Sequence, residues 1–414
     1  MQATVSSQPQ IASPRARARS IALRSPAVVA GSVLAMYAVW IVAYLLAGHD
    51  IRDFIVIGRE FVLKSTVSTS IRFDPTFHYP TGNPLGYDGQ WSYFMAIDPL
   101  HARYYMDFPA YRYTRVLYPL IARLITGGAP ALVPWALVAI NWLAVGAGTF
   151  AVALWLTRRN LSPWLALIYG CYIGIFIGVQ ADLTEPLSFG LIAFAVLLMD
   201  GKRANDWVWS AILFALAMVT RETTGVFAGI YAAAILLAGG RNVKVFARAA
   251  RNWRQAVIFA SIAAGPLLLY KMLLMYWLHS VGVPSQMQLA VIPFSGLMSY
   301  WPFAGHRLIE LDSVVLPALI CLGLTTLAIW KHRLSAPVAI LLANIVLFVL
   351  LLPRDSYVDI FASSRITTGV VLGTLYCLPV FDRLTRGKRH WLAVVVVLWQ
   401  VFLPVQLLEL LINH

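Results

Sequence analysis

Long stretches of almost unbroken apolar side chains constrain this chain more than any other feature of its sequence. One runs from Ala27 to Ala47, and others recur as far as Leu410. A helix needs about 20 apolar residues to cross a bilayer, and in hydrocarbon its backbone groups must all be paired within the helix. Charged residues make up only 12% of the chain, about half their share in soluble domains. The sequence therefore predicts an all-α, polytopic transmembrane protein.

Hydropathy places about eleven membrane spans along the chain, and the shortest must extend into flanking polar residues to reach the ~17 residues of a crossing. They are predicted near Ala27–Ala47, Ala131–Leu156, Leu161–Val179, Leu187–Met199, Trp207–Thr220, Gly225–Gly239, Ala256–Leu278, Val314–Trp330, Ala336–Leu352, Ile366–Phe381 and Trp391–Leu410. Together they form one transmembrane domain, residues 27–414, after a basic N-terminal segment, residues 1–26, that is predicted to be disordered.

Basic residues orient these spans. The N-terminal segment contains arginines and no acidic residue. An arginine-rich arm can bind nucleic acid, but arginines directly before an apolar stretch are more typical of a topology signal, so no nucleic-acid partner is predicted. With the N-terminus in the cytoplasm, more than half of the 32 Lys and Arg residues fall in cytoplasmic segments. Nearly all acidic residues then face the other side of the membrane, where any chemistry is expected.

Missing motifs argue against several function classes. The cytoplasmic loops are short and no GxxxxGK[ST] motif occurs, so an ATP-driven pump is not expected. The three cysteines lie in apolar stretches without CxxC spacing, which indicates packing residues rather than disulfides or a thiolate metal site. No HExxH motif occurs. A divalent cation bound by carboxylates is conceivable, but no ligand set is visible, so neither a metal nor a cofactor is predicted.

The long first external loop, residues 48–130, carries the first candidate site. Its beginning, DIRDFIVIGREFVLK (residues 50–64), predicts a helix in the membrane interface. A second such helix is predicted after Asp88 in GYDGQWSYFMAIDP (residues 86–99). Asp88 is therefore either an N-cap or a reactive carboxylate beside Gly89, which lets a ligand approach the backbone. The side chains that would suit a bound sugar there are Tyr87, Gln90, Trp91 and Tyr93.

Arginines follow in DFPAYRYTRVLYPLIARL (residues 107–124). Arg112 and Arg115 are three residues apart, and helical spacing places Arg115 on one face with Tyr111 and Tyr118. Aromatic residues and arginines at this depth are common membrane anchors. The alternative is a cradle for a lipid phosphate, which guanidinium groups bind well.

Further polar residues interrupt apolar stretches on the same side of the membrane. Glu185 lies in ADLTEP, and Arg221 and Glu222 lie in RETT, where they could form a structural ion pair or belong to a functional site. Lys271 lies within a predicted span and either extends outward or faces a phosphate. Arg365 ends PRDSYVDIFASSR at the entrance to a span. Weaker candidates are Glu310 and Asp312.

The first loop resembles that of the GT-C superfamily of membrane glycosyltransferases. Asp88-Gly89 followed by Tyr93 and Ala96 is similar to their D-[EDG]-x-x-Y-x-x-x-A theme with the spacing shifted by one. YDGQWSYFMAIDP with YRYTRVLYPLIA resembles an uncharacterised bacterial branch of this superfamily. No second acid stands directly beside Asp88, whereas Asp50 and Asp53 occupy the place where several GT-C families keep their acid.

The resemblance implies an inverting glycosyltransferase on the outer face of the bacterial inner membrane. Its donor would be a polyprenyl-phosphate-linked sugar, and its acceptor a glycan, a lipid or a protein. Asp88 would be the general base, with Asp53 and then Asp50 as alternatives. The leaving phosphate would be stabilised by Arg365, which is similar to a rim arginine of the superfamily, assisted by Arg221, Lys271 or Arg115.

Two other function classes remain open. A transporter or flippase for a lipid-linked sugar predicts polar residues in the middle of spans and internal repeats, and neither is visible in the sequence. A non-catalytic scaffold would not require acids and arginines gathered at one membrane edge. If Asp88, Glu222 and Arg365 meet at one cavity, the enzyme hypothesis is favoured over these two classes.

Overall fold

Helices make up nearly all regular structure in the part of the chain that the computed structural model describes. Those residues are 25–60, 85–237, 245–280, 288–303, 308, 310–385, 395, 399 and 400. Within them no β-strand is found beyond one isolated bridge between Ile57 and Gly86. The prediction of an all-α protein is therefore confirmed for the described residues.

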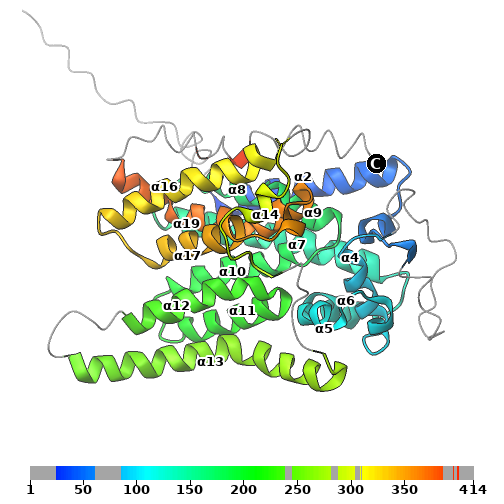
Figure 1. Cartoon of the computed structure of the whole chain (residues 1–414), viewed down its shortest axis with the longest axis horizontal. Helices are drawn as coiled ribbons and strands as arrows, with labels where there is room; N and C mark the ends of the chain where they lie inside the picture. Colours follow the sequence, from blue (N-terminus) through cyan, green and yellow to red (C-terminus); the bar gives the residue numbers. More distant parts are fainter. Residues whose placement is uncertain are drawn as a thin grey trace, which may run out of the picture.

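The long helices pack side by side in a bundle (Figure 1). α7 (Val133–Thr157) packs on α2 (Pro26–Leu46) and on α10 (Glu185–Met199). α10 also packs on α11 (Asp206–Thr220), which contacts α13 (Val245–Leu278). Figure 1 shows α13 along one edge of the bundle and α2 and α16 toward the opposite edge. The other long helices are α12 (Gly225–Leu237), α16 (Leu316–Trp330), α17 (Ala336–Ile345) and α19 (Thr368–Leu384).

Small residues allow the central helices to approach closely. A Cβ at Gly148 of α7 would lie 3.0 Å from the Cα of Gly190 in α10 and 2.7 Å from the Tyr169 hydroxyl. Helices in membranes associate through such close packing, because lipid is as apolar as the side chains themselves. The buried pair of α7 and α10 is therefore the centre of the bundle.

Several helices are long and apolar enough to cross a membrane. Four qualify singly: Pro26–Leu46, Val133–Thr157, Asn252–Leu278 and Leu311–Trp330. Two bent helix pairs would raise the number to six, and further apolar helices are 10–17 residues long. The predicted span Trp391–Leu410 lies almost entirely outside the described residues. The total of about eleven spans therefore remains a prediction.

Two of the predicted spans are not straight helices. The segment predicted as Leu161–Val179 breaks after Gly170 and bends by 52°. The Gly170 carbonyl accepts a hydrogen bond from the Tyr37 hydroxyl at 3.0 Å, which satisfies a backbone group beside the break. The span predicted to begin at Ile366 instead joins α18 (Ile360–Ile366) to α19 through a bend of 41°. Arg365 of α18 consequently lies beside this bend.

The described parts of the predicted first external loop, residues 48–60 and 85–130, fold against the bundle. The helix predicted over residues 50–64 is not continuous: a short 3-10 turn, η1 (Ile51–Ile55), ends at Val56, which adopts a left-handed conformation with φ +51°. Arg59 and Glu60 are helical again, and residues 61–64 lie outside the described part of the chain. The second predicted helix is present as α4 (Gly89–Ile97). It does not lie on a surface, because it is buried against α6 (Leu117–Thr126) and α7.

A close backbone contact fixes the approach to Asp88. Gly86 has φ +65°, and a Cβ there would lie 2.3 Å from the amide nitrogen of Gly58, so the two segments touch. The Gln90 side chain closes this contact, accepting a hydrogen bond from the Gly58 N–H at 3.0 Å and donating one to the Leu85 carbonyl at 2.8 Å. The backbone of Asp88, between Gly86 and Gln90, is therefore held rigidly in this part of the loop.

Candidate active site

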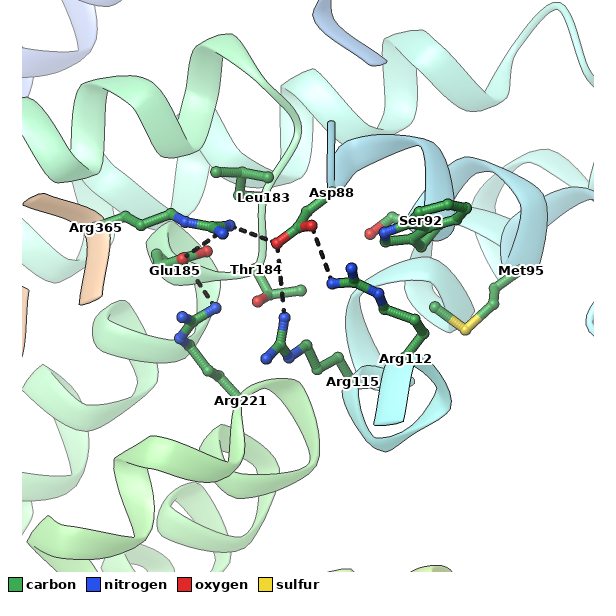
Figure 2. A pocket seen from close by; sticks show the side chains of 11 residues that line it. Asp88, Ser92, Met95, Arg112, Arg115, Leu183, Thr184, Glu185, Arg221 and Arg365 are labelled. Carbon is green, nitrogen blue, oxygen red and sulfur yellow. Dashed lines mark hydrogen bonds and ion pairs between the residues drawn. The ribbon is translucent and has the colours of Figure 1, made fainter. Parts of the chain in front are cut away.

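The Asp88 carboxylate lies where three arginines converge (Figure 2). Its Oδ1 accepts a hydrogen bond from Nη1 of Arg112 at 2.9 Å, and its Oδ2 accepts one from Nη1 of Arg365 at 2.7 Å. Nη1 of Arg115 lies 3.9 Å from Oδ2. Asp88 occupies the position before α4, but its side chain makes no capping hydrogen bond. The interpretation of Asp88 as an N-cap is therefore wrong.

The arginines reach Asp88 from separate elements. Arg112 ends α5 (Pro109–Arg112), and Arg115 ends the 3-10 turn η3 (Tyr113–Arg115) that follows it. Arg365 comes from α18, far along the chain. Asp359 caps α18 by accepting a hydrogen bond from the Ala362 N–H at 2.7 Å. The cluster therefore exists only because the bundle brings α18 to the first external loop.

Two further acids pair with arginines of the cluster. Nη1 of Arg221 lies 2.8 Å from Oε1 of Glu185, and Nη2 of Arg115 donates to Oε1 of Glu222 at 3.1 Å. Nη1 of Arg365 is also 3.7 Å from Oε1 of Glu185. The suggested pair between Arg221 and Glu222 is therefore wrong. Arg221 is extended, with φ −157° and ψ 114°, and the chain enters a 3-10 turn at Glu222, so the neighbours find different partners.

Aromatic rings hold the guanidinium groups in place. Arg112 lies over the Trp91 ring, with 5.2 Å between the guanidinium carbon and the ring centroid. Arg115 lies 4.5 Å from the Tyr111 centroid and also donates a hydrogen bond to the Tyr111 hydroxyl. Such stacking is attractive and fixes the plane of a guanidinium group. Arg112 and Arg115 are thus oriented by neighbouring aromatic side chains as well as by Asp88.

Arg365 and Arg112 have additional supports. Arg365 lies 5.0 Å from the centroid of the Tyr87 ring, so Tyr87 contributes to the cluster as an aromatic platform. Asp107 binds Arg112 with both carboxylate oxygens, each at 2.8 Å. Asp107 was not recognised in the sequence, where an acid five residues before an arginine carries no specific signal.

The arginines control the ionisation of the neighbouring acids. Burial by itself would raise the pKa of the Asp88 carboxyl, but the charges of Arg112, Arg365 and Arg115 hold this pKa far below its ordinary value. Burial and Arg115 oppose each other in the same way at Glu222, whose pKa falls to about 2. Both acids are ionised at neutral pH. Asp88 is consequently a very weak base as long as the arginines hold it.

Two cavities adjoin the cluster and share the side chains of Tyr111 and Glu222. The polar one has a volume of about 280 Å³. Its charged lining residues are Asp88, Arg112, Arg115, Arg221, Glu222, Asp355 and Arg365. The apolar one has a volume of about 490 Å³ and runs along α13. Its lining residues are Ala110, Tyr111, Thr114, Glu222, Leu268, Lys271, Met272, Leu274, Met275 and Ser280.

Lys271 therefore lies beside the apolar cavity and is not among the side chains that hold Asp88. Gln90 and Tyr93 do not line either cavity. Gln90 clamps the loop backbone, and Tyr93 is only 1% exposed, in a buried apolar cluster that also contains Phe94 and Tyr105. Their predicted role in sugar binding is therefore not supported, because the first turn of α4 faces inward.

Asp50 and Asp53 are occupied with each other's backbone. The Asp50 side chain accepts from the Arg52 N–H at 2.9 Å, and the Asp53 side chain accepts from the Asp50 N–H at 2.8 Å. The Asp50 side chain also accepts from the Asp53 N–H, and this reciprocal pair of bonds between Asp50 and Asp53 caps η1. Neither aspartate lines the cavities that contain Asp88 or Lys271. The structure thus gives the two alternative bases a local structural role.

Gly89 allows the loop after α9 (Ile173–Gln180) to pass directly behind Asp88. A Cβ at Gly89 would lie 2.2 Å from the Ala181 carbonyl oxygen. This steric clash could be relieved only by moving the backbone, because the carbonyl oxygen belongs to it. Gly89→Ala is therefore expected to destabilise the protein by about 3 kcal/mol, as overpacking of a core does. The measurement is the free energy of unfolding in detergent micelles.

Gly229→Ala is the matched control, because Gly229 lies within α12 with nothing within 4 Å of its would-be Cβ. It should be neutral or raise stability by up to ~1 kcal/mol, since alanine is the better helix former. Equal stability of the two variants would contradict the close approach at Gly89.

A buried acid supports the loop behind Gly89. Asp182 is 0% exposed and has φ +48°. The Tyr118 hydroxyl lies 3.4 Å from its Oδ1, and Asn141 donates to that hydroxyl at 2.8 Å and to the Leu183 carbonyl at 2.9 Å. Tyr118 thus belongs to this network and does not face the site with Arg115. Asp182 belongs to the ADLTEP segment, and nothing in the sequence distinguishes it from an ordinary loop residue.

Burial raises the pKa of the Asp182 carboxyl well above its ordinary value, which favours the protonated, neutral form in the folded protein. The folded state then binds this proton more tightly than the unfolded state, and stability falls as pH rises from about 4 toward the raised pKa. Asp182→Asn should keep the neutral hydrogen-bonding group and remove this fall. The measurement is the melting temperature of both proteins as the pH is raised from about 4.

Asp182→Ala is the comparison variant, and we expect it to be less stable than Asp182→Asn at every pH because the Tyr118 hydroxyl loses a hydrogen-bond partner. Parallel pH profiles of the wild type and Asp182→Asn would show that the carboxyl is ionised when folded.

Among the described residues, no group of three or more His, Cys, Asp or Glu side chains is placed to hold a metal ion, and a metal-free site stays a prediction. No protein-family model, curated protein or solved structure matches this chain. The geometry of the arginine cluster and its two cavities is therefore the basis for inferring a function.

Proposed function

We propose that the protein is an inverting glycosyltransferase that moves a sugar from a polyprenyl-phosphate donor to an acceptor hydroxyl on the non-cytoplasmic side of a bacterial inner membrane. The observation that carries this proposal is the convergence of Arg112, Arg115 and Arg365 on Asp88, beside an apolar cavity. The resemblance of residues 87–99 and 111–122 to the GT-C superfamily supports it.

The arginines are suited to the phosphate of such a donor. A guanidinium group stays charged and offers N–H donors in a planar fork that matches phosphate oxygens. Arg112 and Arg115 are each 7% exposed or less and are stacked on aromatic rings before any ligand binds. Little side-chain freedom is then lost on binding, which favours affinity.

The apolar cavity is suited to the first units of a prenyl chain. It follows α13, whose outward side chains Leu268, Met272 and Met275 are largely exposed and would face lipid in a membrane. Flexible methionines adapt well to an irregular hydrocarbon ligand. Tyr111 and Glu222 line both this cavity and the cavity that contains the arginines. A phosphate at the junction would leave its prenyl chain on one side and its sugar on the other.

In the proposed reaction, the acceptor oxygen attacks the anomeric carbon from the side opposite the phosphate. Asp88 takes the proton of the acceptor hydroxyl as the new carbon–oxygen bond forms. The bond between the anomeric carbon and the phosphate oxygen breaks, and its electron pair stays on the phosphate. Arg365 and Arg115 stabilise that negative charge, which is effective because both side chains are largely withdrawn from water.

The proposal is tested by incubating the purified protein in lipid nanodiscs with a panel of polyprenyl-phosphate sugars and candidate glycan, lipid and protein acceptors. At least one donor should be consumed with release of polyprenyl phosphate. Arg365→Met should lower this rate by about 100-fold, because a charge-stabilising donor to the leaving group is lost. The control is Arg159→Met: Arg159 also stacks on an aromatic ring, Trp155, and pairs with an acid, Asp200, yet it lines neither cavity.

Equal activity of the two arginine variants would contradict the assignment of Arg365. Absence of transfer from every donor, together with movement of a labelled lipid-linked sugar across proteoliposomes, would replace the enzyme by a flippase.

A further inference from the structure

The space enclosed by the arginine cluster is too small for a phosphate group. Between Asp88, Arg112, Arg115, Arg221 and Arg365 the free volume is about 20 Å³. This is room for about one water molecule. A phosphate is several times larger, so it does not fit into this inner space while the Asp88 carboxylate occupies it. The cavity of about 280 Å³ next to the cluster shows where a larger ligand can enter.

Asp88 makes the contacts that an anionic ligand would make. Its two oxygens lie 2.9 and 2.7 Å from Nη1 of Arg112 and Nη1 of Arg365. These are the distances of charge-assisted hydrogen bonds, and a phosphate oxygen bound to the same nitrogens would form the same bonds. The carboxylate and a ligand phosphate therefore compete for one position.

Each arginine keeps another acid when Asp88 leaves. Arg112 is bound by Asp107 at 2.8 Å, and Arg115 is bound by Glu222 at 3.1 Å. Arg365 lies 3.7 Å from Glu185. The positions of the guanidinium groups therefore do not depend on Asp88. The backbone on both sides of Asp88 is fixed at Gly86 and Gly89, so the carboxylate leaves by rotation of its side chain.

We propose that Asp88 is an internal anion that occupies the phosphate subsite of the empty protein, and that the phosphate of the bound ligand displaces it and thereby frees it to act as the base. The competition follows from the geometry, and only the second part, the use of the freed carboxylate, rests on the proposed glycosyltransferase function. In the empty protein the carboxylate is neutralised by arginines and is unreactive. With ligand bound, it is released from their hydrogen bonds and becomes more basic.

The displaced carboxylate also explains how the cycle closes. After transfer, the proton taken from the acceptor passes from Asp88 to water, and polyprenyl phosphate remains on the arginines. The ionised carboxylate then competes again for Arg112 and Arg365, which favours release of the product. One side chain thus takes part in base catalysis and in product release.

The test is a binding measurement that needs no turnover. Asp88→Asn removes the competing anion, so this variant should bind polyprenyl phosphate about 10- to 100-fold more tightly than the wild type. In the wild type only the minor population with the carboxylate displaced can bind phosphate, whereas in the variant the whole population can. The dissociation constants are measured by equilibrium binding of radiolabelled polyprenyl phosphate in nanodiscs, with the uncharged polyprenol as the control ligand. Inorganic phosphate is titrated in a separate arm as a competitor.

Asp98→Asn is the matched control variant. Asp98 pairs with His101 at 2.8 Å and lines neither cavity, so its replacement should leave the dissociation constant unchanged. Asp88→Ser provides a second removal of the carboxylate, and melting curves verify that each variant is folded.

The outcomes separate the two proposals. Tighter binding of polyprenyl phosphate by both Asp88 variants supports displacement, whether or not sugar is transferred. Tighter binding of inorganic phosphate alone supports displacement and overturns the lipid-linked donor. Unchanged or weaker phosphate binding by the folded variants overturns displacement, even if the wild type proves to be a glycosyltransferase.

Discussion

Asp88→Asn should lower the rate of sugar transfer at saturating donor by about 10²–10⁴-fold, the usual contribution of a general base. Asparagine keeps the shape of the side chain but cannot accept the acceptor proton. The folded state should persist, because Arg112, Arg115 and Arg365 each have another acid nearby. The measurement is the initial rate of transfer with nanodisc-bound protein as donor concentration is varied.

The donor dependence distinguishes a base from a structural residue. If Asp88 is both base and competitor, its replacement lowers kcat and also lowers the apparent KM for the donor, because phosphate no longer has to displace a carboxylate. A purely structural loss would raise KM or reduce the amount of folded protein. Retained transfer in Asp88→Asn would overturn the assignment of Asp88 as the base.

Glu185→Met should cost about 3–5 kcal/mol of stability, the usual effect of removing one partner of a buried ion pair. Glu185 is 0% exposed and Arg221 is 3% exposed, with 2.8 Å between Oε1 and Nη1. Without Glu185, Arg221 is a buried charge that lies near Arg115 and Arg365. These neighbours, together with burial, already hold the pKa of Arg221 below its ordinary value.

The reverse variant, Arg221→Met, should cost less, because Arg365 lies 3.7 Å from the same Glu185 oxygen and can take over as its partner. The double variant Glu185→Met/Arg221→Met should recover most of the loss, since no unpaired charge then remains buried. The free energies of unfolding of the four proteins form a double-mutant cycle.

A partly exposed pair is the control for this cycle. Arg159 and Asp200 are similarly close, at 2.7 Å, but their side chains are 29% and 32% exposed, so removing Asp200 should cost no more than about 1 kcal/mol. Should Glu185→Met prove as mild as Asp200→Asn, burial would not be what makes the Glu185–Arg221 pair important.

Short-range patterns in the sequence were informative where the physics is local. Hydropathy identified the apolar helices, because each apolar side chain prefers lipid or a packed interior whatever its neighbours. Charge in an apolar context likewise selected Asp88, Arg112, Arg115, Glu185 and Arg365 as candidates, because a charge there is costly unless it is paired.

Local patterns failed where backbone geometry or partners decide. The helix predicted over residues 50–64 is interrupted at Val56, whose left-handed conformation does not follow from its β-branched side chain. Gln90 and Tyr93 stood in a suitable motif, yet they are used for packing and for clamping the loop. Arg221 and Glu222 are adjacent in sequence but bind Glu185 and Arg115, respectively.

The sequence by itself determined that this chain is an apolar, all-helical protein, and it determined which charged side chains need an explanation. Only the tertiary structure decided that Asp88 meets Arg365 across 277 positions of sequence and that Arg221 is held by Glu185. Burial propensity belongs to each residue, whereas an ion pair depends on the distance between two groups, and that distance is set by how α18, α10 and the first external loop pack.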